Sequence, residues 1–233
     1  MEILEKLGRL LRFGGEMLPA RDAYALWADS YPPRPHNALM EAEQSVLAPT
    51  LVGISHALSR DPLRTRRALD VGTGTGRYLP LVAPAGMKLT VGLDLSMPML
   101  QRQTSGYARI CSDACRLPFP DASFDVVCSS LMAGDVERID TFLSEVSRVL
   151  APGGHLAYSD FHPSWVTEHW RRTFHAADGR LIELPYFPHT IDDHLSALER
   201  LALSVRTIRE PRVDGRGAPV VVVFHAVKVR RPC

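Results

Sequence analysis

The chain has 233 residues, which suits one domain with an addition and is long enough to bury a sizeable core. Hydrophobic residues make up 45% and charged residues 23%, and 27 basic against 26 acidic side chains leave a net charge of +1, so no global charge indicates nucleic acid. With no apolar run of about 18 residues, no signal peptide and four cysteines outside any Cys-x-x-Cys pair, we expect a cytoplasmic protein without a membrane span.

Residues 1–62 are predicted to be mostly helical and to form a lid beside a domain of residues 63–233. Apolar residues recur at helical spacing from Ile3 to Leu11. A short aromatic helix is expected from Arg21 to Tyr31, because the prolines that follow bar its continuation. A third helix is expected to follow these prolines, and Pro49 is expected to kink or split it.

A glycine-rich turn follows the first predicted strand. The strand ends in Asp70 and opens at once into glycines at positions 72, 74 and 76. Alternate glycines let the backbone adopt positive φ angles and let a ligand lie directly on the main chain. The spacing differs from the dinucleotide fingerprint G-x-G-x-x-G, and a carboxylate here would repel a pyrophosphate but attract an amino group or a sulfonium. The turn therefore predicts a cofactor site for a ligand that carries a cationic group.

Strand and helix patterns alternate after this turn, which predicts an α/β fold with a Rossmann-like, doubly wound parallel sheet. An insertion rich in aromatic residues interrupts the alternation at residues 162–190, and a turn near the C-terminus predicts that the last two strands form a hairpin. The strands expected between the turn and the insertion are residues 88–94, 108–112, 124–130 and 155–161.

Three acidic residues are expected on one rim of this sheet. Asp70 closes the first strand, Asp94 closes the second, and Asp113 follows the third. An open parallel sheet binds its ligand at the carboxyl ends of its strands, where these residues fall. A single aspartate in such a place often only caps the next helix. Three of them around the glycine turn favour a cofactor site.

These motifs resemble the class I S-adenosylmethionine (SAM) methyltransferases, whose first signature is an acid followed by G-x-G-x-G. The segments Leu117–Asp125 and Val149–Gly154 are similar to the branch with the ubiquinone, menaquinone and biotin-pathway malonyl carrier-protein methyltransferases. The resemblance covers about residues 63–161. It implies a seven-stranded, mostly parallel sheet with an antiparallel last strand, SAM as cofactor, and in-line methyl transfer to an oxygen, nitrogen or carbon nucleophile of a small molecule.

The resemblance also implies roles for the residues around the turn. Asp94 would accept hydrogen bonds from both ribose hydroxyls of SAM, which suits a carboxylate because it offers acceptors only. Asp113 and Ala114 would contact the adenine. The other residues expected to bind the cofactor are Asp70, Gly72, Thr73, Gly74, Gly76, Leu95, Met99, Ser130 and Leu131.

The sequence contains weaker motifs for the residues that would contact the methyl acceptor. Asp160 and His162 lie at the carboxyl end of the fifth strand, near the expected methyl group, so His162 is the first candidate for a general base and His36 the second. The aromatic residues expected to contact the acceptor are Tyr24, Tyr31 and Trp165. The insertion histidines are seven, six and fourteen residues apart and lack a compact ligand pair, so no metal is predicted.

Two other functions stay open at this point. A non-catalytic protein that binds SAM or a nucleoside would carry the same donor motifs. Arg171 and Arg172, beside Trp170, could bind RNA, as an RNA methyltransferase requires. A dehydrogenase is disfavoured by Asp70 and the glycine spacing, and the Asn-Pro-Pro-Tyr motif of DNA methylators is absent. We expect a small-molecule methyl acceptor, no DNA partner, and a monomer or homodimer.

Overall fold

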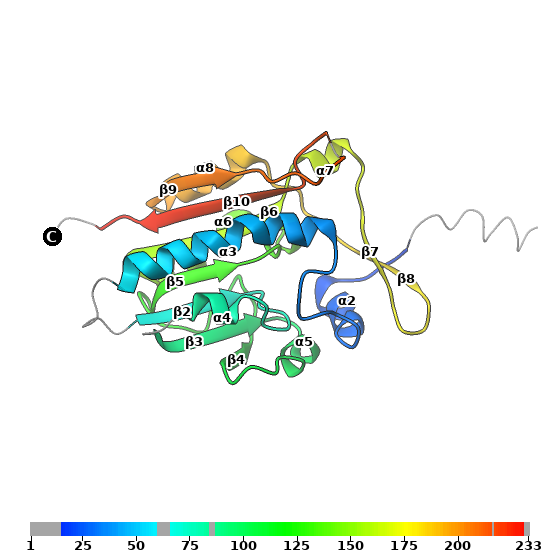
Figure 1. Ribbon diagram of the computed structural model, residues 1–233, viewed down its shortest axis with the longest axis horizontal. Helices are drawn as coiled ribbons and strands as arrows, with labels where there is room; N and C mark the ends of the chain where they lie inside the picture. Colours follow the sequence, from blue (N-terminus) through cyan, green and yellow to red (C-terminus); the bar gives the residue numbers. More distant parts are fainter. Residues whose placement is uncertain (1–14, 60–65, 84–86, 216, 231–233) are drawn as a thin grey trace, which may run out of the picture.

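The computed structural model of the chain describes residues 15–59, 66–83, 87–215 and 217–230 (Figure 1). In this part of the chain a large sheet lies between two layers of helices, and a smaller sheet lies at one end (Figure 1). The helix predicted from Ile3 to Leu11 falls outside the described residues. Within them, no helix combines the length and the apolar composition that a membrane span requires.

The large sheet has seven strands, and their order confirms the predicted α/β fold. In spatial order they are β4 (Ala108–Cys111), β3 (Met87–Asp94), β2 (Arg66–Val71), β5 (Phe124–Ser129), β6 (Leu150–Phe161), β10 (Val221–Lys228) and β9 (Leu203–Arg209). Strand β10 runs antiparallel to β6 and β9, and the other neighbours run parallel. The strand order reverses between β2 and β5, the kind of point at which such sheets bind ligands.

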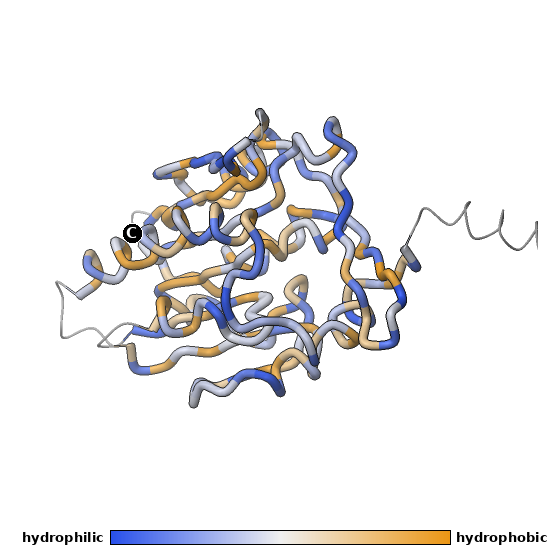
Figure 2. The backbone as a smooth tube through the Cα atoms, turned by 45° about the vertical axis from the view of Figure 1, so that its right-hand side comes forward, coloured by the Kyte–Doolittle hydropathy of each residue, from blue (hydrophilic) through white to orange (hydrophobic). Residues whose placement is uncertain are grey.

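Helices cover both faces of this sheet. They are α3 (Ala38–Ser59) and α4 (Leu79–Val82) on one face, and α6 (Ile139–Val149) and α8 (Ile191–Arg200) on the other. Leu69 and Val71 pack in the core cluster with α6 and α8, whereas Ala68 packs with α3 and α4. This alternation follows from the two-residue period of a strand. Figure 2 shows the hydrophobic residues gathered along the central strands, which are buried on both sides.

Helix α3 packs directly on the sheet, although it was predicted as part of a separate lid. Its residues Leu47, Leu51 and Ile54 are buried in the core cluster that includes Val221. The helix also runs without a break through Pro49, so the predicted split does not occur. The apolar stripe thus predicted the helix correctly, but not the surface against which it packs.

The rest of the described N-terminal segment joins the aromatic insertion. Strand β1 (Glu16–Met17) pairs with β8 (Leu181–Leu184), and β8 pairs with β7 (Arg172–His175). Helix α2 (Ala20–Trp27) packs on this small sheet through Ala23. We call α2, β1, β7 and β8 the roof, because Figure 1 shows them beyond the carboxyl ends of β2 and β3. The remaining short helices are α5 (Met97–Gln101), η1 (Ala133–Asp135) and α7 (Ser164–Thr167).

Candidate cofactor and acceptor site

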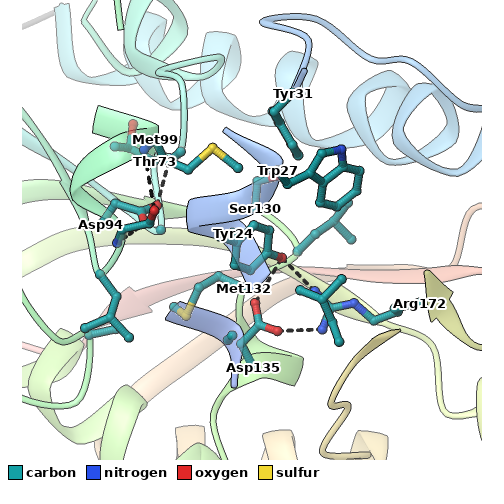
Figure 3. A pocket seen from close by; sticks show the side chains of 18 of the residues that line it. Tyr24, Trp27, Tyr31, Thr73, Asp94, Met99, Ser130, Met132, Asp135 and Arg172 are labelled. Atoms are coloured by element: carbon teal, nitrogen blue, oxygen red, sulfur yellow. Dashed lines mark hydrogen bonds and ion pairs between the residues drawn. The ribbon is translucent and has the colours of Figure 1, made fainter. Parts of the chain in front are cut away.

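A cavity of about 460 Å³ lies between the carboxyl ends of the parallel strands and the roof (Figure 3). Its walls come from the glycine turn after β2, the ends of β3 and β5, and α2 and β7 of the roof. The cavity therefore lies beside the point where strand order reverses, as the fold predicts.

Two glycines of the turn have different geometric reasons to be glycine. Gly72 has a φ angle of 70°, and a Cβ atom there would lie 2.5 Å from Cγ of Met132. Gly74 has a φ angle of 56°, lines the cavity, and an added Cβ would meet no atom within 4 Å. The first glycine lets the turn fold against Met132, and the second leaves its backbone open to a ligand.

Asp70 places an unpaired acceptor beside this turn. The carboxylate is 1% exposed, and its Oδ2 accepts a hydrogen bond of 2.7 Å from the Thr73 hydroxyl. Its Oδ1 is buried and has no hydrogen-bond partner among the described residues. Burial raises the pKa of Asp70 to about 7, although the bond from Thr73 opposes the rise. A cationic ligand group would satisfy Oδ1 and favour the ionised carboxylate.

Asp94 and Asp113 both carry the local contacts of a capping residue and both line the cavity. Asp94 accepts hydrogen bonds from the backbone N–H of Gly74, at 2.7 Å, and of Ser96, at 2.8 Å. Burial raises the pKa of Asp94, although these bonds oppose the rise. Asp113 accepts a bond of 2.8 Å from the N–H of Cys115 and is exposed. Asp94 and Asp113 therefore make capping contacts and line the cavity at the same time, so a capping role does not exclude a role in ligand binding.

Most of the residues predicted for the site line this one cavity. They are Asp70, Gly72, Thr73, Gly74, Asp94, Leu95, Met99, Asp113, Ala114, Ser130 and Leu131 from the cofactor set, and Tyr24, Tyr31, His36 and Trp165 from the acceptor set. Gly76 is buried behind the turn, where an added Cβ would lie 3.0 Å from Gln103 and Leu79. It supports the turn and does not line the cavity.

The structure does not bring His162 and Asp160 to the cavity wall. Asp160 is fully buried, with its Oδ2 3.2 Å from Nε2 of His194 on α8. His162 lies with its Nε2 3.2 Å from Oε1 of Glu210. Because side chains alternate along β6, Phe161 lines the cavity and Asp160 faces the layer of α8. The role of His162 as a base stays a prediction, without a contact to the cavity in its favour.

We call the end of the cavity at the glycine turn, lined by Asp70, Gly74 and Asp94, the donor end. A charged network beneath it was not predicted from the sequence. Arg77 lines the cavity, and its Nη2 donates to Glu43 Oε2 at 3.1 Å and to Ser130 Oγ at 2.8 Å. Glu43 is fully buried and also accepts hydrogen bonds from the hydroxyls of Tyr78, Ser130 and Ser159, at 2.6, 2.8 and 2.9 Å. The sequence did contain a sign of this network: an acidic residue, Glu43, falls on the apolar face of α3, four residues before Leu47.

A second missed network joins the roof to the sheet (Figure 3). Nη1 of Arg172, on β7, lies 2.5 Å from Oδ1 of Asp135 on η1. Nη2 of Arg172 donates to the hydroxyl of Tyr24 on α2 at 2.6 Å, and that hydroxyl donates to Asp135 Oδ2 at 3.2 Å. Burial raises the pKa of Tyr24, so its phenol is neutral near pH 7. Trp27, also unpredicted, stacks on Phe174 with ring centroids 4.4 Å apart.

Within the described residues, no group of three or more histidine, cysteine, aspartate or glutamate side chains is arranged to hold a metal ion. Arg172, considered above as a contact to RNA, is 9% exposed and engaged with Asp135 and Tyr24. Arg171 beside it is exposed and forms an ion pair with Glu183. The two adjacent arginines therefore do not form one basic surface.

Comparisons with known proteins agree with this geometry. Residues 69–158 match the family described as "Methyltransferase domain". The chain is 33% identical to malonyl-[acyl-carrier protein] O-methyltransferase of Methylococcus capsulatus over 184 residues, 75% of this chain and 63% of that protein. It is 41% identical to demethylmenaquinone methyltransferase of Tropheryma whipplei over 101 residues, 41% of this chain and 42% of that protein. The matched part of the chain thus spans less than two thirds of the length of either relative.

The fold is also found among solved structures. The S-adenosylmethionine dependent methyltransferase from Mesorhizobium loti superimposes with a TM-score of 0.58 and 23% sequence identity. The superposition covers 77% of this chain and 96% of that structure. At this level of identity the likeness concerns the fold.

Proposed function

We propose that the chain transfers the methyl group of SAM to a small-molecule acceptor, and the match of residues 69–158 to the methyltransferase-domain family supports this. The observation that carries the proposal is the donor end of the cavity. There Gly74, with its bare backbone, Asp70, whose buried Oδ1 has no hydrogen-bond partner among the described residues, and Asp94 line one wall. We further expect a cytoplasmic location, no DNA partner, and a monomer or homodimer.

The residues at this wall fit SAM by their chemistry. The ammonium group of SAM matches the buried acceptor of Asp70, and its vicinal ribose hydroxyls match the two acceptor oxygens of Asp94. Arg77 offers a cation to the carboxylate of the methionine part, and the space beside Gly74 admits a ligand against the backbone. The acids favour a cationic donor over a pyrophosphate, which supports SAM over a dinucleotide.

When bound, SAM would supply a methyl carbon activated by the positive sulfur; the acceptor's electron pair would form the new bond, and the carbon–sulfur electrons would remain on sulfur. The protein's part is to align the acceptor and to exclude water. Tyr24, Tyr31, Phe161 and Trp165 line the cavity toward the roof and offer apolar walls for this purpose. The proton that an acidic acceptor loses must pass to a base or to water.

His36 is the better placed of the two histidines proposed as this base. It lines the cavity, and burial lowers its pKa, so the imidazole is neutral near pH 7 and can accept a proton. We expect His36→Phe to lower kcat at pH 7 by about 100-fold on an acceptor that loses a proton, because a positioned base contributes at least this much. His162→Phe is the matched control and should retain kcat. A larger loss in the His162 variant would reverse the assignment.

The pH dependence of SAM binding tests Asp70. Its pKa is raised to about 7 without ligand, and an ammonium partner favours the ionised form. SAM affinity should therefore rise as the pH rises toward 7, by up to about tenfold per pH unit, and one proton should be released below pH 7. Calorimetry in two buffers of different ionisation enthalpy measures both effects. In Asp70→Asn this part of the dependence should vanish, and an unchanged pH profile in that variant would contradict the pairing.

A metabolite extract incubated with protein and methyl-labelled SAM tests the function itself. We expect label in at least one small molecule, and less label with the Asp94→Ala variant when labelled SAM is kept at a low concentration. A protein that binds SAM but labels nothing in extracts from several sources would support the non-catalytic binding protein. Label confined to added RNA would support the RNA methyltransferase.

A further inference from the structure

The balance of charged residues that line the cavity differs between its two ends. At the donor end they are Asp70, Asp94, Asp113 and Arg77. At the end under the roof they are Arg21, Arg171, Arg172, Asp135 and Glu137. Acids outnumber arginines at the first end, and arginines outnumber acids at the second. A cationic donor fits the first end, and the arginines of the second end include donors for an acceptor with a negatively charged group, although Arg171 is paired with Glu183.

Arg172 presents an unused hydrogen-bonding edge at the roof end. A guanidinium carries five N–H donors in a fixed plane. Nη1 is engaged by Asp135 and, at 3.3 Å, by the carbonyl oxygen of Pro185, and Nη2 donates once, to Tyr24. Among the described residues none accepts a hydrogen bond from Nε or from the second hydrogen of Nη2. Nε and Nη2 lie along one edge of the planar guanidinium, with the spacing that binds both oxygens of a carboxylate.

This edge is held in a rigid position. The guanidinium lies over the ring of Phe161, 4.6 Å from its centroid, and its side chain is 7% exposed. Burial acts to lower the pKa of Arg172, but the neighbouring Asp135 and Tyr24 outweigh it and raise the pKa, so the group stays charged. A charged donor fixed before the ligand arrives loses little entropy on binding.

Aromatic side chains surround the same end of the cavity. Phe161 packs edge-on against Trp165, with centroids 4.7 Å apart, and both line the cavity. Tyr24 and Trp27 of α2 stack with centroids 6.2 Å apart and line it from the roof. Such walls favour a flat, apolar ligand body.

We propose that the methyl acceptor is an aromatic carboxylic acid whose carboxylate binds the Nε and Nη2 edge of Arg172. The inference rests on the proposed function and names the substrate class of that site. The ring of the acid lies among the aromatic walls, and the carboxylate serves as the anchor. Because its oxygens accept hydrogen bonds from the guanidinium, the methylated atom is a different nucleophile of the acceptor, directed toward Ser130 and Met132 at the donor side.

Binding measurements with matched ligands test this proposal. The protein is saturated with S-adenosylhomocysteine, the product of methyl donation, and titrated with benzoate, 4-hydroxybenzoate, cinnamate, 2-naphthoate and indole-3-acetate. Each acid is compared with its primary amide, which has the same shape without the charge. We expect at least one acid to bind at least about tenfold more tightly than its amide, as two charge-assisted hydrogen bonds imply.

Substitutions assign this preference to Arg172. Arg172→Lys keeps the charge beside Asp135 but removes the two-donor edge, and Arg172→Met removes both. Both variants should lose the preference for the acid, and Arg172→Lys, which keeps a counter-charge for Asp135, should bind S-adenosylhomocysteine as before. Arg180→Met is the control, because Arg180 is exposed on the same hairpin and pairs with Glu16 and Asp178. No acid preferred over its amide, or a preference that persists in Arg172→Lys, would overturn the proposal.

The outcome separates this inference from the proposed function. Methyl transfer to an uncharged acceptor, with no acid bound more tightly than its amide, would contradict the aromatic-acid proposal and support the proposed methyltransferase function. Selective acid binding that depends on Arg172, without methyl transfer to any acceptor, would support the acid-binding site and contradict the proposed methyltransferase function.

Discussion

Replacing Glu43 with alanine is expected to lower the free energy of unfolding by about 3 to 5 kcal/mol, because removal of one partner strands a buried charge. Glu43 is fully buried and accepts hydrogen bonds from Arg77, Tyr78, Ser130 and Ser159. Without it the Arg77 guanidinium, 13% exposed, loses its counter-charge, and three hydroxyl groups lose an acceptor. Urea unfolding at pH 7 measures the change.

Two further variants make this result specific. Glu41→Ala removes a glutamate exposed on the same helix, and should change the unfolding free energy by about 0.5 kcal/mol or less. Glu43→Gln keeps the shape and one acceptor oxygen, so its loss should be intermediate. A loss below about 1 kcal/mol in Glu43→Ala would show that this network does not stabilise the fold.

The Asp94→Ala variant is expected to bind SAM more weakly by about 1 to 3 kcal/mol, roughly 5- to 150-fold, because it loses paired hydrogen bonds to a carboxylate. The carboxylate also holds the N–H groups of Gly74 and Ser96, so its loss loosens the turn that faces the ligand. Both effects weaken binding in the same direction. Calorimetry with SAM measures the sum.

Controls separate the ligand contact from the effect on folding. Asp94→Asn keeps one acceptor oxygen and should lose less affinity than alanine. Asp192→Ala removes an exposed acid on α8, outside the cavity lining, and should bind SAM like the unmodified chain. Unchanged affinity for SAM in a folded Asp94→Ala variant would contradict the proposal that Asp94 binds the ribose hydroxyls.

The acceptor end shows where sequence patterns stop being informative. The aromatic helix and the insertion were recognisable from composition, but their shared sheet of β1, β8 and β7 was not. A strand pattern records which side chains share a face and does not record what covers that face. His162 and Asp160 were therefore expected at the methyl group, whereas the two-residue period of β6 turns Phe161 to the cavity instead.

The sequence alone predicted the glycine turn and the acids at the donor end, because their pattern is local: an acid, alternating glycines and capping residues act within a few positions of one another. Asp70 and its partner Thr73 are three residues apart, and Asp94 and Ser96 are two apart. The tertiary structure alone decided the roof. Tyr24 meets Asp135 across 111 positions and Arg172 across 148, contacts that depend on how β7 and α2 pack and that no local period encodes.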